Sequence, residues 1–172
     1  MTGIAALGSR VASRRAIIVL LVAAAATIGG AYLFEYGWGF APCKLCLTQR
    51  KPYYVAIAIA TGALLLPGER ARRAALAVLA LVFLVGAGLG AYHAGAEWGF
   101  WPGPSDCGGG TATSADIGGF LHSLETTRVV NCTEAAWRFL GLSLAGWNVL
   151  ISLSLSAYAA WAARHGSSSV SQ

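Results

Sequence analysis

Four cysteines are the residues of this chain whose types and spacing could do chemistry. Cys43 and Cys46 form the tetrapeptide Cys-Lys-Leu-Cys, and Cys107 and Cys132 lie 25 positions apart. Such a set could form two structural disulfides, a four-thiolate zinc site or a dithiol relay. A zinc site of this kind usually has two short C-x-x-C hooks. The spacing of Cys107 and Cys132 does not provide the second hook, so we expect no bound metal.

The C-x-x-C pair favours the relay over a structural disulfide. A disulfide within this motif closes so small a ring that it adds little stability, and such rings are common in redox-active pairs. The motif leads into an expected helix, whose positive N-terminus favours a thiolate. Arg50 follows Cys46 by four residues, on the same helical face. A guanidinium there would lower the pKa of the Cys46 thiol further.

The composition decides what kind of protein positions these residues. The chain has 172 residues, of which 56% are hydrophobic and 11% are charged, and its mean hydropathy is +0.62. Soluble domains carry about 25% charged residues, so the composition excludes disorder and disfavours an ordinary soluble enzyme. The net charge is +5, but the basic residues are too scattered to indicate a nucleic-acid partner.

Four uncharged stretches are long enough to matter: Ala16–Phe34, Pro52–Gly68, Ala74–Ala96 and Phe139–Ala163. About 20 helical residues cross a bilayer core, and a span in lipid must be helical to satisfy its own backbone. The second stretch is short, so we expect its helix to start near Cys46, with Pro52 in or just after the first turn. The first stretch resembles a signal peptide, but it continues beyond a typical apolar region.

These stretches predict an all-α membrane protein, a bundle of four transmembrane helices in one domain over residues 1–172. The expected spans are approximately 16–34, 47–67, 74–95 and 140–163. The loops on one side of this frame carry seven basic residues and one acidic residue, against five and six on the other. The positive-inside rule therefore places both termini in the cytoplasm. Loops 35–46 and 96–138 then face outward and hold all four cysteines, in a compartment where disulfides persist.

The second outward loop contains a further periodic segment. Ile117, Phe120, Leu121 and Leu124 lie on one face of a helix, which we expect to rest on the membrane surface and to bring the second cysteine pair near the first. Packing against the spans is the other interpretation.

Small and polar residues inside the expected spans suit contacts between helices. Gly86 with Gly90, and Ser152 with Ser156, are small residues one turn apart, and such residues let membrane helices approach closely. We expect Asn148 to form a hydrogen bond between helices rather than to serve in a site.

The order of these features resembles that of the DsbB family, the bacterial inner-membrane oxidases that generate disulfides de novo. Each motif is weak by itself, but their order along a four-span frame is specific and covers nearly the whole chain. The motifs are Pro42-Cys43-Lys44-Leu45-Cys46 with Arg50, Tyr92-His93, Pro102-x-Pro104 before Cys107, and Cys132 followed by Trp137-Arg138-Phe139-Leu140-Gly141-Leu142.

The resemblance implies a catalytic role for all four cysteines. A partner thiolate would attack the Cys107–Cys132 disulfide through Cys107, and Cys132 would then exchange with Cys43. Cys46 would remain as the thiolate that passes electrons onward. The departures from the family pattern are Lys44-Leu45 between the motif cysteines and the glycines that follow Cys107, which bear on partner choice.

The resemblance also implies a cofactor, a partner and a location. The cofactor would be a quinone, with ubiquinone expected and menaquinone as the alternative, bound by Arg50, His93 and Cys46. The partner would be a periplasmic DsbA-like protein of the thioredoxin fold. The chain would be a monomeric, multi-pass protein of the bacterial inner membrane, in contact with lipid and the quinone pool.

Two alternatives stay open. A vitamin K epoxide reductase-like protein also combines four helices, a C-x-x-C motif and a quinone-type substrate, but there the motif lies at a late span. A non-enzymatic membrane scaffold with two structural disulfides is the alternative of a different class.

Overall fold

The structure is a computed structural model that describes residues 2–104 and 132–165, with side chains described from residue 11 onward. It is mostly helical. The elements are α1 (Thr2–Tyr32), the π-helix η1 (Leu33–Gly37), α2 (Lys44–Leu65), α3 (Glu69–Glu97), β1 (Arg138–Phe139), β2 (Leu142–Ser143) and α5 (Leu144–His165).

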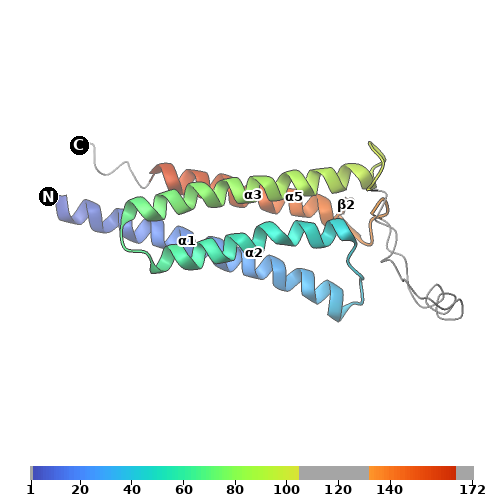
Figure 1. Cartoon of the computed structure of the whole chain (residues 1–172), viewed down its shortest axis with the longest axis horizontal. Helices are drawn as coiled ribbons and strands as arrows, with labels where there is room; N and C mark the ends of the chain where they lie inside the picture. Colours follow the sequence, from blue (N-terminus) through green and yellow to red (C-terminus); the bar gives the residue numbers. More distant parts are fainter. Residues whose placement is uncertain (1, 105–131, 166–172) are drawn as a thin grey trace, which may run out of the picture.

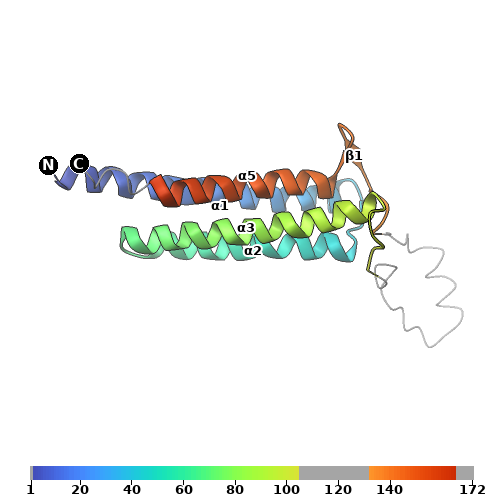
Figure 2. The same ribbon diagram turned by 90° about the horizontal axis from the view of Figure 1, so that it is seen from above.

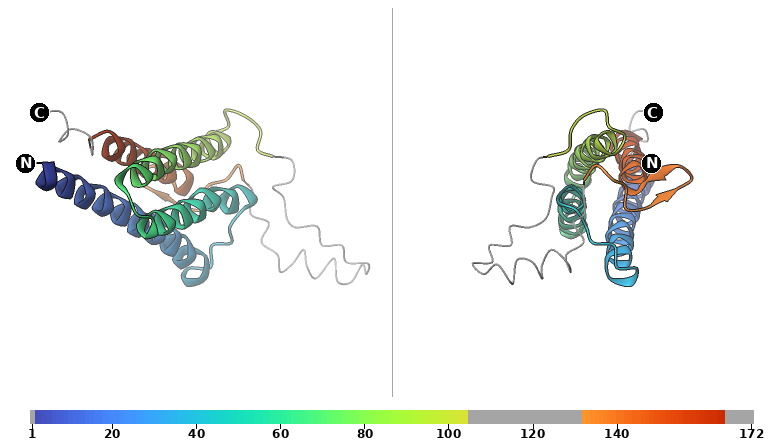
Figure 3. Two further views of the ribbon diagram at one scale, coloured as in Figure 1. Left: turned by 60° about the vertical axis from the view of Figure 1, so that its left-hand side comes forward. Right: turned by 90° about the vertical axis from the view of Figure 1, so that its right-hand side faces the viewer.

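The long helices run side by side and make an elongated bundle (Figure 1). Figure 2 shows two layers, α1 with α5 and α2 with α3. The start of α1, the end of α5 and the α2–α3 connection lie at one end, while segments 38–43 and 98–104 and the β1–β2 hairpin lie at the other (Figure 1). The right-hand view of Figure 3 looks along the bundle and shows the pair α2 and α3 beside the pair α1 and α5. The arginine-rich end, formed by Arg70, Arg72 and Arg73 at the start of α3, and the cysteine motif are therefore at opposite ends of the bundle.

Three helical stretches of the described residues are long and apolar enough to cross a membrane: Val11–Gly37, Glu69–Glu97 and Leu144–His165. This agrees with an all-α, multi-pass membrane protein. Helix α2 lies alongside these stretches but is not among them; its N-terminal part includes Lys44, Thr48, Gln49, Arg50 and Lys51, which lower its mean hydropathy. A count of four spans stays a prediction.

Two local expectations were wrong. Pro52 was expected in or just after the first turn of its helix, but α2 begins at Lys44 and holds Pro52 in its interior. The last helix was expected to start near residue 140. Instead, residues 138–143 form a short antiparallel hairpin. Leu140 and Gly141 at its tip have φ values of 52° and 81°, which a right-handed helix cannot contain. The uncharged sequence of this segment hid the turn.

The half of the bundle away from the cysteines is filled with aliphatic and small side chains. The buried residues there include Ile17, Leu20, Leu76, Leu79 and Phe83, together with many alanines. Small residues let the backbones approach closely, since lipid supplies no hydrophobic drive between helices.

The glycines of α3 pack as predicted. A Cβ added at Gly86 would lie 3.3 Å from Ser152 Oγ and 3.4 Å from Pro52 Cβ. A Cβ at Gly90 would lie 3.0 Å from Val149 Cγ2 and 3.1 Å from Asn148 Nδ2. Both glycines therefore admit neighbouring helices at contact distance.

At the arginine-rich end, the carboxylate of Glu69 connects residues of two helices. Glu69, in the first turn of α3, accepts a 2.8 Å hydrogen bond from Ser13 Oγ. It also pairs with Arg73 at 3.1 Å and with Arg72 at 3.9 Å. A carboxylate at a helix N-terminus is favoured by the helix dipole, so Glu69 links α1 to the start of α3.

Candidate active site

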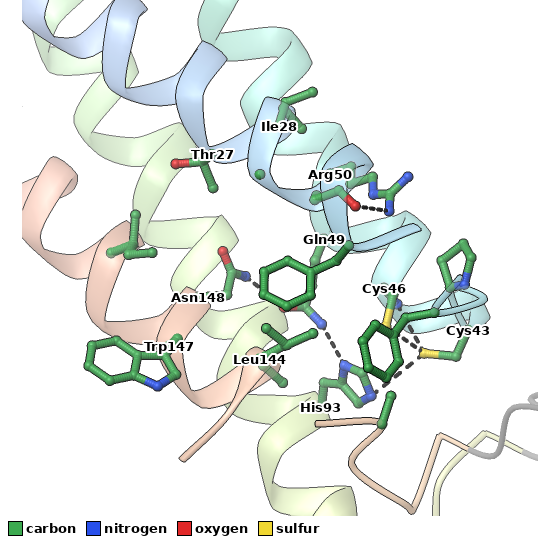
Figure 4. A pocket seen from close by; sticks show the side chains of 18 of the residues that line it. Thr27, Ile28, Cys43, Cys46, Gln49, Arg50, His93, Leu144, Trp147 and Asn148 are labelled. Atoms are coloured by element: carbon green, nitrogen blue, oxygen red, sulfur yellow. Dashed lines mark hydrogen bonds between the residues drawn. The ribbon is translucent and has the colours of Figure 1, made fainter. Parts of the chain in front are cut away.

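The C-x-x-C motif lies where α2 begins. Cys43 is the N-cap residue, and its Sγ accepts the backbone N–H of Cys46 at 3.2 Å. The two sulfur atoms are unbonded and 2.9 Å apart (Figure 4). The helix start therefore fixes both sulfurs in one small volume, Cys43 fully buried and Cys46 partly so.

The geometry of the reduced pair places the negative charge on Cys43. The hydrogen bond from the Cys46 thiol, the bond from His93 and the Cys46 backbone N–H lower the pKa of Cys43 from 9.0 to about 4, although burial opposes the shift. The hydrogen bond to Cys43 and burial raise the pKa of Cys46, so we assign the proton between the two sulfurs to Cys46. The sequence analysis expected Arg50 and the helix dipole to lower the pKa of Cys46, whereas in the reduced pair that pKa is raised by the hydrogen bond to Cys43 and by burial. The expected Cys46 thiolate belongs to the state in which Cys43 is bonded to Cys132, and it stays a prediction.

The second cysteine pair is described through one member. Cys132 is disulfide-bonded, and its expected partner Cys107 lies outside the described residues, as does the predicted helix over residues 117–124. Cys132 is 1% exposed and shares one buried cluster with Cys43, against which Leu45 and Cys46 pack. A disulfide sulfur of the second loop is thus beside the first pair.

A cavity of about 320 Å³ opens next to the motif. Its wall is largely apolar and comes from α1, η1, α2, α3 and α5. Cys43, Cys46, Arg50 and His93 all contribute to it (Figure 4). Small-molecule sites have about this size and combine an apolar wall with a few placed polar groups. The structure therefore brings together four of the predicted site residues, and the cavity suits an apolar ligand with a polar ring.

Arg50 is held by η1 and by the end of α1. Its Nη1 donates to Glu35 Oε2 at 2.6 Å, and its Nη2 donates to the carbonyl of Ala31 at 3.4 Å. The guanidinium also lies 5.0 Å from the ring centroid of Tyr32, a cation–π distance. Among the described residues its ionic partner is Glu35 and not the Cys46 thiol, which the sequence analysis had expected beside it.

The π-helix η1 explains how Glu35 reaches Arg50. A π turn widens the helix and changes the direction of the side chains within it, and such turns are frequent at functional sites. Glu35 lies in this turn. The sequence analysis did not select Glu35, because nothing in the residue types of Leu33–Gly37 predicts a π turn.

His93 lies on α3, opposite the motif. It is 3% exposed, and its Nε2 is 3.7 Å from both Cys43 Sγ and Glu97 Oε1. Its Nδ1 lies 2.6 Å from Gln49 Nε2. Cys43, Cys46 and His93 offer three ligand atoms within 4.8 Å of one another, but the close sulfur pair and the hydrogen bonds of His93 already engage these atoms with one another.

The sequence analysis did not select two residues of the site, although their helical spacing from predicted site residues indicated them. Gln49 follows Cys46 by three residues, and Glu97 follows His93 by four, so each shares a helical face with a predicted site residue. Both line the cavity. Asn148 bonds Gln49 and Tyr53 of α2 from α5, which confirms the expected hydrogen bond between helices and places it at the site.

Comparisons with known proteins agree on one family. The family model described as disulfide bond formation protein DsbB matches residues 13–162. A disulfide bond formation protein B from Aromatoleum aromaticum is 32% identical over 151 residues, which cover 80% of this chain and 85% of the relative. Another, from Marinobacter nauticus, is 30% identical over 139 residues, covering 77% and 80%. No solved structure gives a significant match.

The motif at the start of α2, the buried cysteine cluster and the cavity are the features that a disulfide-forming membrane protein needs. The family model covers most of the chain, and the relatives align with it over most of their own length. The chain therefore belongs to the DsbB family of membrane proteins for disulfide bond formation.

Proposed function

We propose that this protein reoxidises a periplasmic DsbA-like thiol oxidase and passes the electrons through its two cysteine pairs to membrane quinone. The observation that carries the proposal is one arrangement: disulfide-bonded Cys132 is buried beside Cys43, and Cys43 and Cys46 border a largely apolar cavity. Partners of this kind are strong oxidants, so only a stronger electron sink can reoxidise them. A membrane quinone is such a sink and reaches a site between membrane helices.

The thiol steps balance in bonds and electrons. Attack by the partner's thiolate on Cys107 forms a mixed disulfide, breaks the Cys107–Cys132 bond and releases Cys132 as a thiolate. Cys132 then attacks Cys43, which forms the Cys43–Cys132 bond, breaks the Cys43–Cys46 bond and releases Cys46 as a thiolate. The partner's second thiolate then attacks the mixed disulfide, which forms the partner's disulfide and releases Cys107 as a thiolate. Attack by Cys107 on Cys132 re-forms the outer bond, breaks the Cys43–Cys132 bond and releases Cys43. Each disulfide formed replaces one broken, and the two electrons of the partner dithiol end on Cys43 and Cys46.

The quinone, when bound, supplies the two-electron acceptor, and its reduction to quinol takes up two protons. The residues present fit such a ligand, because the cavity is apolar and its polar groups gather at the motif. Once Cys43 is bonded to Cys132 it carries no charge, so the negative charge rests on Cys46 at the cavity wall. Arg50 offers a permanent positive charge there, with a planar fork suited to a carbonyl oxygen.

The test is anaerobic mixing of the purified protein with quinone and a reduced DsbA-like protein, following quinone absorbance. We expect one quinone reduced for each partner disulfide formed. Thiol oxidation without quinone reduction, or no reaction with either compound, would contradict the proposal. The second outcome is also what a scaffold with structural disulfides predicts.

The orientation has its own test. We propose that both termini are cytoplasmic and that loops 35–46 and 96–138 face the periplasm, which is supported by the loop charges and by the position of the cysteine motif at the end opposite Glu69. Single cysteines introduced at Ser9 and Ser168 should resist an impermeant thiol reagent in intact cells. Labelling of either from outside would reverse the topology.

A vitamin K epoxide reductase-like activity is less well supported. The motif precedes α2 instead of following a late span, and the family match is to DsbB. Ubiquinone and menaquinone compared in the same assay would identify the preferred acceptor, and the mass of the protein in detergent would test the expected monomer.

A further inference from the structure

A chain of polar side chains runs through the interior to His93. The Tyr53 hydroxyl donates to Asn148 Oδ1 at 2.6 Å, and Asn148 Nδ2 donates to Gln49 Oε1 at 2.6 Å. Gln49 Nε2 then lies 2.6 Å from His93 Nδ1 (Figure 4). Helices α2 and α5 pack less closely against each other than each packs against α3, and these side chains bridge the space between them.

Each group in this chain has a defined direction. Ser152 Oγ also donates to Asn148 Oδ1, at 3.4 Å. The Asn148 oxygen therefore accepts from two hydroxyls, and the Asn148 NH₂ group faces Gln49. The Gln49 oxygen is engaged by that NH₂ group, which leaves the Gln49 NH₂ group facing His93. A neutral imidazole has one protonated nitrogen and one bare nitrogen. A donor aimed at Nδ1 requires Nδ1 to be bare, and the ring proton is then on Nε2.

The other side of the ring leads to the same assignment independently. Cys43 Sγ and Glu97 Oε1 both lie 3.7 Å from Nε2, and a thiolate and a carboxylate are acceptors only. A bare Nε2 would face the two acceptors with its lone pair, whereas a protonated Nε2 can donate to Cys43 Sγ and carries its N–H towards Glu97. Donors on the Nδ1 side and acceptors on the Nε2 side thus favour one tautomer.

We propose that Gln49, Asn148 and Tyr53 are positioning residues that hold His93 in the tautomer with its proton on Nε2, aimed at Cys43. The functional meaning rests on the relay proposed above. A donor to Cys43 stabilises it as a thiolate, and a thiol of lower pKa leaves faster. His93 would therefore favour the release of Cys43 when Cys107 attacks Cys132 and the outer disulfide re-forms. The chain from Tyr53 therefore sets the exchange behaviour of a sulfur that it does not touch.

Other ionisable groups also surround Cys43 and His93, and they contribute to any titration measured there. Substitutions in the polar chain leave all of them in place, so differences between variants report the tautomer. These groups are Lys44 and Cys46 at the start of α2, Glu97 on α3, the Arg50–Glu35 pair and Glu134 on the cavity wall.

The primary test is ¹⁵N NMR of the histidine rings in the reduced, full-length protein. The sequence has three histidines, and the His93 signals are assigned by comparison with a His93→Gln variant. Protonated and bare ring nitrogens have distinct shifts, so the spectrum reads the tautomer directly. We expect His93 to be protonated on Nε2 and bare on Nδ1. A proton on Nδ1 in the unsubstituted protein would overturn the proposal without any variant.

A graded series tests which residues hold the tautomer. Gln49→Met removes the direct donor and should give a mixture of tautomers, Asn148→Leu a smaller change, and Tyr53→Phe the smallest. The matched control is Tyr54→Phe, because the Tyr54 hydroxyl bonds Tyr32 at 2.8 Å outside the chain. An unchanged tautomer in Gln49→Met and Asn148→Leu would limit the chain to holding helices together.

The titration of Cys43 supplies the second readout, followed by thiolate absorbance. Losing one hydrogen bond to a charged group should raise the pKa of Cys43 by about one pH unit in Gln49→Met, a change of about tenfold in the thiolate fraction near the midpoint. Neither readout needs a partner or a quinone. Quinone reduction by the unsubstituted protein therefore tests the proposed function separately.

Discussion

The two ends of the bundle differ in how closely their side chains pack. Away from the cysteines, Ile17, Leu76, Leu79 and Phe83 are completely buried, and the partly buried carboxylate of Glu69 has three partners. At the cysteine end there is a cavity, a thiolate and the carboxylate Glu97, whose Oε2 has no hydrogen-bond partner among the described residues. A buried polar atom without a partner among the described residues is present at each end, since Arg72 Nε at the packed end also has none. The two ends therefore differ in packing: close packing stabilises a fold, and the end with the candidate chemistry gives up part of it to the cavity.

The largest effect should come from single cysteines at the functional end. Cys107→Ala should abolish oxidation of the partner while leaving Cys43–Cys46 able to react with quinone, because only the outer pair meets the partner. Cys43→Ser should abolish both activities. Normal partner oxidation by Cys107→Ala would disprove the proposed order of the relay.

The second-largest effect should be seen in the titration of Cys43, which has no counterpart at the packed end. The thiolate absorbance of the reduced protein should appear with a midpoint near pH 4, as the pKa of Cys43 is lowered from 9.0 to about 4. Because the folded pKa is below the unfolded one, ionisation of Cys43 stabilises the reduced fold fully above about pH 9. That contribution is lost as the pH falls towards 4.

Removal of the Cys46 thiol tests whether its hydrogen bond is the main cause of the low pKa of Cys43. Cys46→Ala deletes the thiol that donates to Cys43 and should move the midpoint to higher pH. A midpoint that stays near 9 in the unsubstituted protein would mean that the reduced pair does not adopt this geometry.

The packed end should respond in stability and not in chemistry. Leu79 is 0% exposed, and Leu79→Ala should lower the free energy of unfolding by about 2–5 kcal/mol. Leu81 on the same helix is 62% exposed, so Leu81→Ala is the matched control and should cost much less. Denaturation in detergent measures both variants, and the quinone KM should change in neither.

The smallest predicted effect concerns Arg50. Arg50→Met should raise the KM for quinone about tenfold, equivalent to about 1.4 kcal/mol of binding, since one charged contact is lost while the apolar wall remains. Lys51→Met is the control, because Lys51 is exposed. Unchanged KM and kcat in Arg50→Met would remove Arg50 from the site and leave it as a structural partner of Glu35.

The site residues that lie close together in the sequence could be predicted from it. Cys43, Cys46 and Arg50 lie within about two helical turns, so motif spacing was sufficient to group them. His93 was added only through the resemblance to the DsbB family. The coarse class, an all-α membrane protein, follows from charge depletion alone.

The rest depends on contacts between distant segments. Glu35 reaches Arg50 only because the end of the first helix opens into a π turn. Gln49 and Asn148 meet only when α2 and α5 flank α3 at one register. The low pKa of Cys43 in the reduced pair was not predicted for a similar reason: residue order does not reveal whether Cys43 caps the helix or precedes the cap.

That capping role has a consequence for the backbone. The negative sulfur of Cys43 satisfies an N–H of the first turn of α2, which would otherwise have no partner within the helix. Any reaction that takes the charge from this sulfur also weakens the cap, so the start of α2 should loosen whenever Cys43 enters a disulfide with Cys132. The Cys46 amide then becomes a redox reporter: its hydrogen exchange should be slow in the reduced protein and faster in the linked one. Hydrogen exchange at this one amide would then report formation of the Cys43–Cys132 bond through the loosening of the first turn of α2.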